Sequence, residues 1–158
     1  MDKSSMKQLK HYKSHYIGDN SNTSHLLSAL PLSEYGYIFE DVEGKITTSY
    51  RTHVQSFGWQ NPVTNGAMSG TSGEAKRLEA IQIKLYGEMA NRFDVYYRVH
   101  AQSYGWLGWA KNGEEAGTAG YAKRLEGIQI VLVPKGSAAP ANNYKNIQSV
   151  NTKAYIKK

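Results

Sequence analysis

The stretch YRVHAQSYGWLGWAKNGEEAGTAGYAKRLEGIQIVL, residues 97–132, decides the fold because the chain contains it twice. Residues 50–85 read YRTHVQSFGWQNPVTNGAMSGTSGEAKRLEAIQIKL and align with it without a gap, at an offset of about 47 residues. More than half of the aligned positions are identical, which shared composition does not produce in an ungapped alignment. The sequence therefore predicts two tandem copies of one structural unit.

Each copy begins and ends with a pattern typical of a β-strand. At the start, residues 50–55 and 97–102 alternate, so that Arg51 and His53, like Arg98 and His100, share one face. The final segment of each copy is its most apolar strand, and we expect its isoleucines to be buried. These are Ile81 and Ile83 in the first copy and Ile128 and Ile130 in the second.

Glycines mark the turns between these strands. Gly58 and Gly105 predict a sharp bend that reorients the tryptophan after each of them. The dipeptides Asn65-Gly66 and Asn112-Gly113 predict a tight type I′ hairpin in each copy, because both residue types tolerate positive φ.

A glutamate at the start of each final strand conflicts with this pattern. Strict alternation places Glu79 and Glu126 on the buried face, which an unpaired carboxylate opposes. In one solution, a bulge at the small residue that follows turns the glutamate outward. In the other, the carboxylate is buried and paired, so that Arg77 with Glu79 ties the strand to His53, and Arg124 with Glu126 ties it to His100.

Composition agrees with an all-β fold. The 158 residues include 12 tyrosines and 15 glycines, which suit short strands and tight turns. There is no cysteine, so neither a disulfide framework nor a thiolate metal site is available. The formal charge of +6 favours anionic partners. We expect two pseudo-symmetric repeats of short antiparallel strands, sandwich or prism-like, with a basic N-terminal tail or short helix.

The predicted organisation has five parts. They are a basic N-terminal extension over 1–34, lead-in strands over 35–49, a first repeat over 50–86, a second over 93–133, and a linker with a closing C-terminal strand over 134–158. Residues 1–14 lack the apolar core of a signal peptide, and no apolar run reaches the roughly 20 residues of a membrane span. We therefore expect the chain to carry no export signal of its own.

The order His-x-Gln-x-x-Gly-Trp, Asn-Gly, Gly-Thr-x-Gly and Arg-Leu-Glu-x-Ile-x-Ile resembles the clostridial hydrophobic repeats with a signature tryptophan, the ChW repeats. The resemblance covers about half of the chain. It implies a secreted or surface-associated protein of the Firmicutes, in which such repeats accompany peptidoglycan hydrolases and phage endolysins. Only the second copy has a paired tryptophan, Trp109, where the first has Pro62.

Aromatic and polar side chains near the turns are the candidate ligand site. Aromatic faces stack on sugar rings while planar polar groups bind the hydroxyls. The same residues also suit a structural role, the tryptophans as core and the polar set as a buried network between the first and last strands. The candidates are Trp59, Trp106, Trp109, His53, His100, Gln55, Gln102, Arg77 and Arg124.

No catalytic, metal or cofactor site is expected. No carboxylate pair or activated nucleophile stands out from the duplicated background, and duplication favours a multivalent binding module over an enzyme. His11 and His15 lie four residues apart, as in zinc sites on helices, but no third ligand follows at a useful spacing.

The functional hypothesis is a non-catalytic module that attaches a peptidoglycan hydrolase or phage endolysin to the bacterial wall, through peptidoglycan or wall polysaccharide. The alternative is a protein-interaction or assembly module of a secreted surface complex. Partners would be a wall glycan or polymer and a catalytic domain or full-length lysin, with a homo-oligomer left open and nucleic acid disfavoured. We expect an extracellular, wall-associated location, which a phage-encoded chain would reach by release at lysis.

Overall fold

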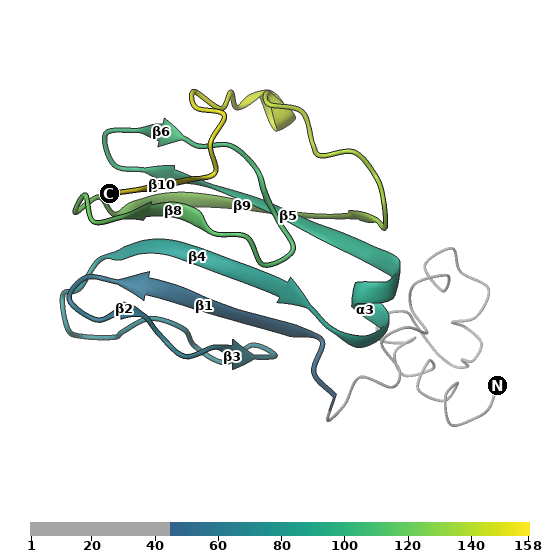
Figure 1. Ribbon diagram of the computed structural model, residues 1–158, viewed down its shortest axis with the longest axis horizontal. Helices are drawn as coiled ribbons and strands as arrows, with labels where there is room; N and C mark the ends of the chain where they lie inside the picture. Colours follow the sequence, from purple (N-terminus) through teal and green to yellow (C-terminus); the bar gives the residue numbers. More distant parts are fainter. Residues whose placement is uncertain (1–44) are drawn as a thin grey trace, which may run out of the picture. The chain divides into compact units, whose positions relative to one another are not determined.

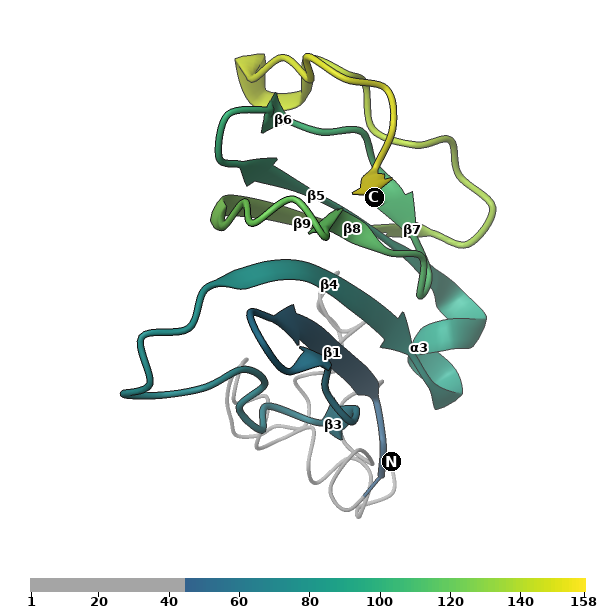
Figure 2. The ribbon, with the colours of Figure 1, turned by 60° about the vertical axis from the view of Figure 1, so that its left-hand side comes forward.

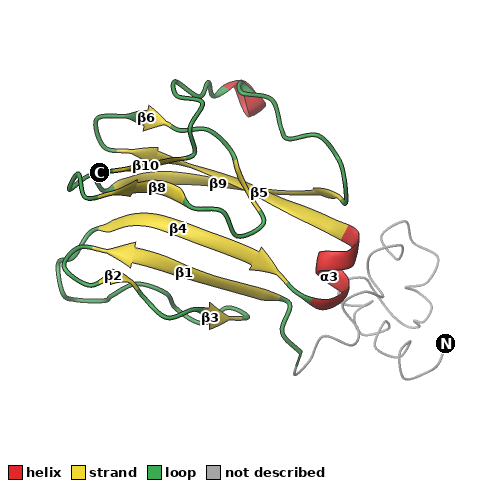
Figure 3. Cartoon of the chain, viewed as in Figure 1, coloured by secondary structure: helices red, strands yellow, loops and turns green. Residues whose placement is uncertain are grey.

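The computed structural model describes residues 45–158, in which strands are the main secondary structure and helix is almost absent (Figures 1 and 3). Within this range one short α-helix, α3 (Gly87–Arg92), joins the two repeats, and one 3-10 helix, η3 (Tyr144–Asn146), lies near the C-terminus. The predicted basic N-terminal helix or tail, the His11/His15 pair and most of the lead-in strands lie outside the described residues. The predicted all-β class with two repeats is confirmed.

The two repeats share four strands at the same spacing, and the second repeat has a fifth strand, β8, without a counterpart in the first. The first contains β1 (Thr48–Val54), β2 (Gly58–Trp59), β3 (Val63–Thr64) and β4 (Leu78–Leu85). The second contains β5 (Phe93–Ala101), β6 (Gly105–Trp106), β7 (Ala110–Lys111), β8 (Ala116–Ala119) and β9 (Leu125–Pro134). In each repeat the first strand pairs antiparallel with the last along its whole length, and with the two short strands.

The bend at each Gly-Trp has a specific consequence. Ser56 and Gly58 adopt positive φ, and the turn sends β2 back along β1, so that Trp59 faces His53 across the strand pair. Ser103 and Gly105 repeat this geometry, and Trp106 faces His100. The spacing His-x-Gln-x-x-Gly-Trp is therefore the spacing of a turn that brings its first and last residues together.

The Asn-Gly dipeptides form the predicted turn but not the predicted hairpin. Asn65, Gly66, Asn112 and Gly113 all have positive φ. However, the strands before them, β3 and β7, pair with β1 and β5 rather than with the residues that follow the turn. The asparagine side chains explain this difference, because the Asn65 amide oxygen accepts a bond from the Thr48 N–H and that of Asn112 from the Val95 N–H, which fixes each turn to the first strand.

A β-bulge at each glutamate resolves the conflict in the sequence. Strand pairing runs from His53–Ala80 to Val54–Leu78, so that Glu79 is the extra residue, and Glu126 is the extra residue in the second repeat. The bulge lies at the glutamate itself and does not turn Glu79 outward, so the first repeat follows the second predicted solution, a carboxylate that is buried and paired.

Strand β8 belongs to the second repeat in sequence and to the first in hydrogen bonding. It pairs antiparallel with β4 and parallel with β10 (Tyr155–Lys157), giving the order β10-β8-β4-β1-β2 (Figure 2). Gly117 lies so close to β4 that a Cβ on it would collide with the backbone of Glu79 and Ala80. The strand β10 lies at the C-terminal end of residues 134–158, where a closing strand was expected.

The shared core forms where the second repeat covers β4. The Tyr97 hydroxyl accepts a bond from the Ile83 N–H, and burial raises the pKa of Tyr97 to about 12. Ile83 is 8% exposed, as predicted, whereas its counterpart Ile130 is 54% exposed. The predicted burial of Ile128 and Ile130 is wrong. The strand β9 pairs only with β5, and no described strand pairs with its other edge as β8 pairs with β4.

Asp94 ties the start of the second repeat to two turns. Its carboxylate accepts bonds from the Asn112 side chain and the Gly136 N–H, and the ammonium groups of Lys111 and Lys135 lie within 4 Å. The hydrogen bond from Asn112 is the largest of the effects that lower its pKa to about 2, and they outweigh the opposing effect of burial.

Because this pKa is below the ordinary value of 3.8, Asp94 stabilises the fold above about pH 4, and this stabilisation is lost as the pH falls toward 2. We expect Asp94→Asn to lower the melting temperature at pH 7 and to reduce the loss between pH 4 and 2. Thermal melting across this range tests it, with Glu88→Gln, an exposed helical carboxylate, as control. Equal acid sensitivity of Asp94→Asn and the parent protein would contradict the assignment.

Candidate functional site

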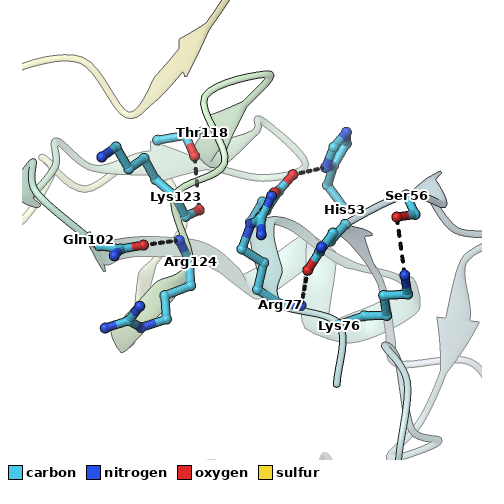
Figure 4. A network of polar contacts seen from close by, with 10 residues as sticks. His53, Ser56, Lys76, Arg77, Gln102, Thr118, Lys123 and Arg124 are labelled. Carbon is cyan, nitrogen blue, oxygen red and sulfur yellow. Dashed lines mark hydrogen bonds and ion pairs between the residues drawn. The ribbon is translucent and has the colours of Figure 1, made fainter. Parts of the chain in front are cut away.

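A chain of polar contacts surrounds the signature tryptophan of the first repeat. The His53 ring stands edge-on to Trp59, with ring centroids 5.4 Å apart. The imidazole Nδ1 lies 3.0 Å from one oxygen of Glu79, and the other oxygen accepts a bond of 2.7 Å from Arg77 Nε (Figure 4). Nδ1 makes no hydrogen bond of good geometry, so its contact with the carboxylate is electrostatic. The predicted link from Arg77 through Glu79 to His53 is confirmed.

The second repeat builds the same set in a more open setting. His100 is edge-on to Trp106 at 5.5 Å, its Nδ1 is 3.2 Å from Glu126, and Arg124 is 2.9 Å from the other carboxylate oxygen. The Glu126 side chain is 32% exposed where that of Glu79 is 6%. The same contacts therefore face water in the second repeat and are enclosed in the first.

The candidate glutamines have a structural position. The backbone N–H of Gln55 donates to the Arg77 carbonyl, and its side-chain oxygen accepts from the Arg77 N–H. Gln102 and Arg124 repeat both bonds, one of which is drawn in Figure 4. Each glutamine thus closes the end of the first and last strands beside the bulge.

Sequence reasoning missed the residue that covers the other side of each tryptophan. The guanidinium carbon of Arg51 lies 5.1 Å from the Trp59 ring centroid, and that of Arg98 lies 5.3 Å from the Trp106 centroid. Both donate through Nε to a glutamine of the last strand, Gln82 or Gln129. The signal was available, because alternation places each arginine on the same face as the histidine two residues later.

Trp109 lies apart from the histidine and glutamate groups. It is half-buried, its indole N–H donates to the Ala141 carbonyl, and its ring is edge-on to Tyr144 at 5.8 Å. The guanidinium of Arg98 lies 4.6 Å from its centroid. Trp109 therefore packs against the C-terminal segment, which runs beside β6 in Figure 1 through a bond from the Val150 N–H to the Trp106 carbonyl.

These features define an all-β protein made of two tandem repeats, each centred on a tryptophan between an arginine and a histidine. The family model called Clostridial hydrophobic W, or ChW, matches residues 53–87 and 100–134. The chain therefore contains two tandem ChW repeats. No curated protein and no solved structure matches it.

Residues 45–158 contain neither a cluster of metal-ligating side chains nor a membrane-spanning helix. No group of three or more histidine, aspartate or glutamate side chains there is placed to hold a metal ion. No helix in this range is long and apolar enough to cross a membrane. The ligand-binding role of the nine candidate residues stays a prediction.

The different burial of the two glutamates makes a matched pair of variants. Glu79→Gln removes a charge that is enclosed between an imidazole and a guanidinium, and we expect it to lower the free energy of unfolding by about 1–3 kcal/mol. Glu126→Gln removes a charge that water screens, and the cost should stay below about 1 kcal/mol. Urea denaturation of both variants measures the difference, and equal losses would refute a structural role specific to the enclosed contacts.

Proposed function

We propose that the chain is a non-catalytic module that attaches a peptidoglycan hydrolase or phage endolysin to the bacterial wall. The observation that carries this proposal is the group of arginine, tryptophan and histidine that occurs at the same place in both repeats. In each group the arginine lies over the tryptophan ring and the histidine stands edge-on to it. An enzyme needs one asymmetric centre, whereas a polymer of repeating units rewards two equivalent contacts on one chain. The ligand would be a wall glycan or an attached polymer.

Charge and aromatic surface support the same partner. The chain carries a formal charge of +6, and anionic polymers attract such a surface at low salt. Aromatic faces next to planar polar groups suit the apolar faces and hydroxyls of sugar rings. A single stack contributes about 1 kcal/mol, so one contact would be weak, and two linked contacts would raise retention through effective concentration.

Binding to purified cell walls, with and without their attached polysaccharide, tests the proposal. We expect Trp106→Ala to reduce the fraction of protein retained, because it removes the aromatic ring of one of the two repeated groups. Thermal melting of the same variant shows whether a loss of binding comes from a destabilised fold. Met68→Ala, which removes an exposed apolar side chain elsewhere, is the matched control and should bind like the parent. Retention of a well-folded Trp106→Ala protein at the parent level would refute the role of the repeated arginine, tryptophan and histidine group in wall binding.

A second candidate function, assembly with another β protein, is favoured by β9. This edge strand is ten residues long and exposes Ile128, Ile130 and Leu132 on one face. Long exposed apolar edges are sites of strand pairing. By analogy with the pairing of β4 with β8, the partner would supply a short strand of small residues, such as that of another ChW repeat.

Sedimentation velocity over a range of concentrations tests this alternative. We expect self-association of the parent protein and its loss in Ile130→Lys, because a charge on the edge opposes pairing. A concentration-independent monomer would remove the observation in favour of assembly between copies of this chain.

A further inference from the structure

A hollow of about 300 Å³ lies between the sheet of the first repeat and the Asn112-Gly113 turn of the second. Its lining includes Tyr50 and Arg51 from β1, Lys84 from β4, and the rings of Pro62 and Tyr86. None of the candidate residues predicted from the sequence lines it. We call it the Arg51 hollow.

The equivalent position in the second repeat is filled by the protein itself. Tyr96, Arg98 and Trp109 stand where the first repeat has Ser49, Arg51 and Pro62, all of which line the hollow. Each of these three contacts the C-terminal segment between Ser137 and Ser149. The second repeat therefore shows what the shared scaffold holds at this place, which is a chain of oxygen acceptors.

Arg98 shows how the acceptors are held. Beyond its bond to Gln129, its terminal nitrogens donate to four oxygens: the carbonyls of Asn142, Tyr144 and Ile147 and the Ser149 hydroxyl. Arg51 makes the corresponding bond to Gln82 and lies over the corresponding tryptophan. Its four remaining N–H groups have no acceptor among the residues that the structure describes. A guanidinium fixed in this way presents a planar set of donors to the hollow.

The charge of the hollow selects among ligands. Lys84 stands where the second repeat has Val131, so that the first repeat places a second cation beside the arginine. No carboxylate side chain is among the described lining residues. Neutral carbonyls satisfy Arg98, whereas two cations in one polar hollow favour an oxygen-rich anion.

We propose that the Arg51 hollow binds an oxyanion carried on a small polyol or sugar, with Arg51 as the fork donor and Lys84 as the second charge. Tyr86, 40% exposed, offers a ring beside the anion for the carbon skeleton. The anion is a phosphate ester or a carboxylate, and both occur on polymers outside the cell membrane. This inference rests on the proposed function only for the source of the ligand.

Titration of the full chain, followed by amide NMR shifts, tests the proposal. The probes are glycerol 1-phosphate for the phosphate ester, N-acetylmuramic acid for the carboxylate, and N-acetylglucosamine as the neutral sugar. We expect saturable shifts of the amides of Gln82 and Gly113 with one or both anionic probes, weakened by added salt, and none with the neutral sugar. Whichever anion binds more tightly identifies the source.

Two exposed lysines give a charge-matched pair of variants. Lys84→Glu reverses a charge in the hollow and should weaken binding of the anionic probe at least about tenfold. Lys153→Glu makes the same change of net charge outside the hollow and should leave binding within about twofold. Lys84→Val, which copies the second repeat, should fall between them. Unchanged melting of each variant shows that the fold is retained.

The titrations test the Arg51 hollow independently of wall attachment. Absence of saturable shifts with both anions, equal shifts with the neutral sugar, or equal weakening by both charge reversals would overturn the proposal. Wall retention that fails while the titration succeeds would remove the proposed function and leave the oxyanion site. The reverse result would remove the site and leave wall attachment to the tryptophans.

Discussion

The pairing of β8 with β4 is the interaction on which the rest of the structure depends. It places a strand of the second repeat in the sheet of the first. This requires glycine at position 117, because the two backbones can approach so closely only where the α-carbon carries no Cβ. The same pairing brings Tyr97 over Ile83 and encloses Glu79. Two units that each bury little surface thus share one core, as neighbouring repeats in repeat proteins do.

The local structure of each repeat was predictable from the sequence because local rules determine it. Period-two alternation located β1, β4, β5 and β9, and positive φ at Asn65 and Gly66 formed the expected turn. The cost of burying a carboxylate predicted the partners of Glu79. The fate of the isoleucines was not predictable, since Ile83 and Ile130 occupy identical local patterns and differ only in what covers them.

The candidate site divides in the same way. Pairing of His53 with Glu79 follows from strand register, which alternation reveals. The position of Trp109 depends on the C-terminal segment, whose path through Asn142 and Ser149 has no periodic signal. Arg98 organises that segment, yet in the sequence it looks identical to Arg51. Because both copies contain the arginine, the sequence suggests the same structural role for each. It does not reveal that only Arg98 has hydrogen-bond acceptors for its terminal nitrogens within the described chain.

The difference between the two arginines also bears on how a duplicated module acquires function. A repeat is constrained where both copies use a residue for the same contacts, as with the Trp59 and Trp106 stacks. The two copies can differ where a segment of the same chain packs against only one of them, as the C-terminal segment packs against the second repeat. Lys84 in place of Val131 and Pro62 in place of Trp109 are divergences at such a place. In the second repeat the C-terminal segment occupies this place, and it leads to the strand β10, whose pairing with β8 completes the shared sheet. The first repeat has the same arginine without acceptors for its terminal nitrogens among the described residues, so it is this repeat, and not the one with the extra tryptophan, that offers a charged concave surface to a ligand.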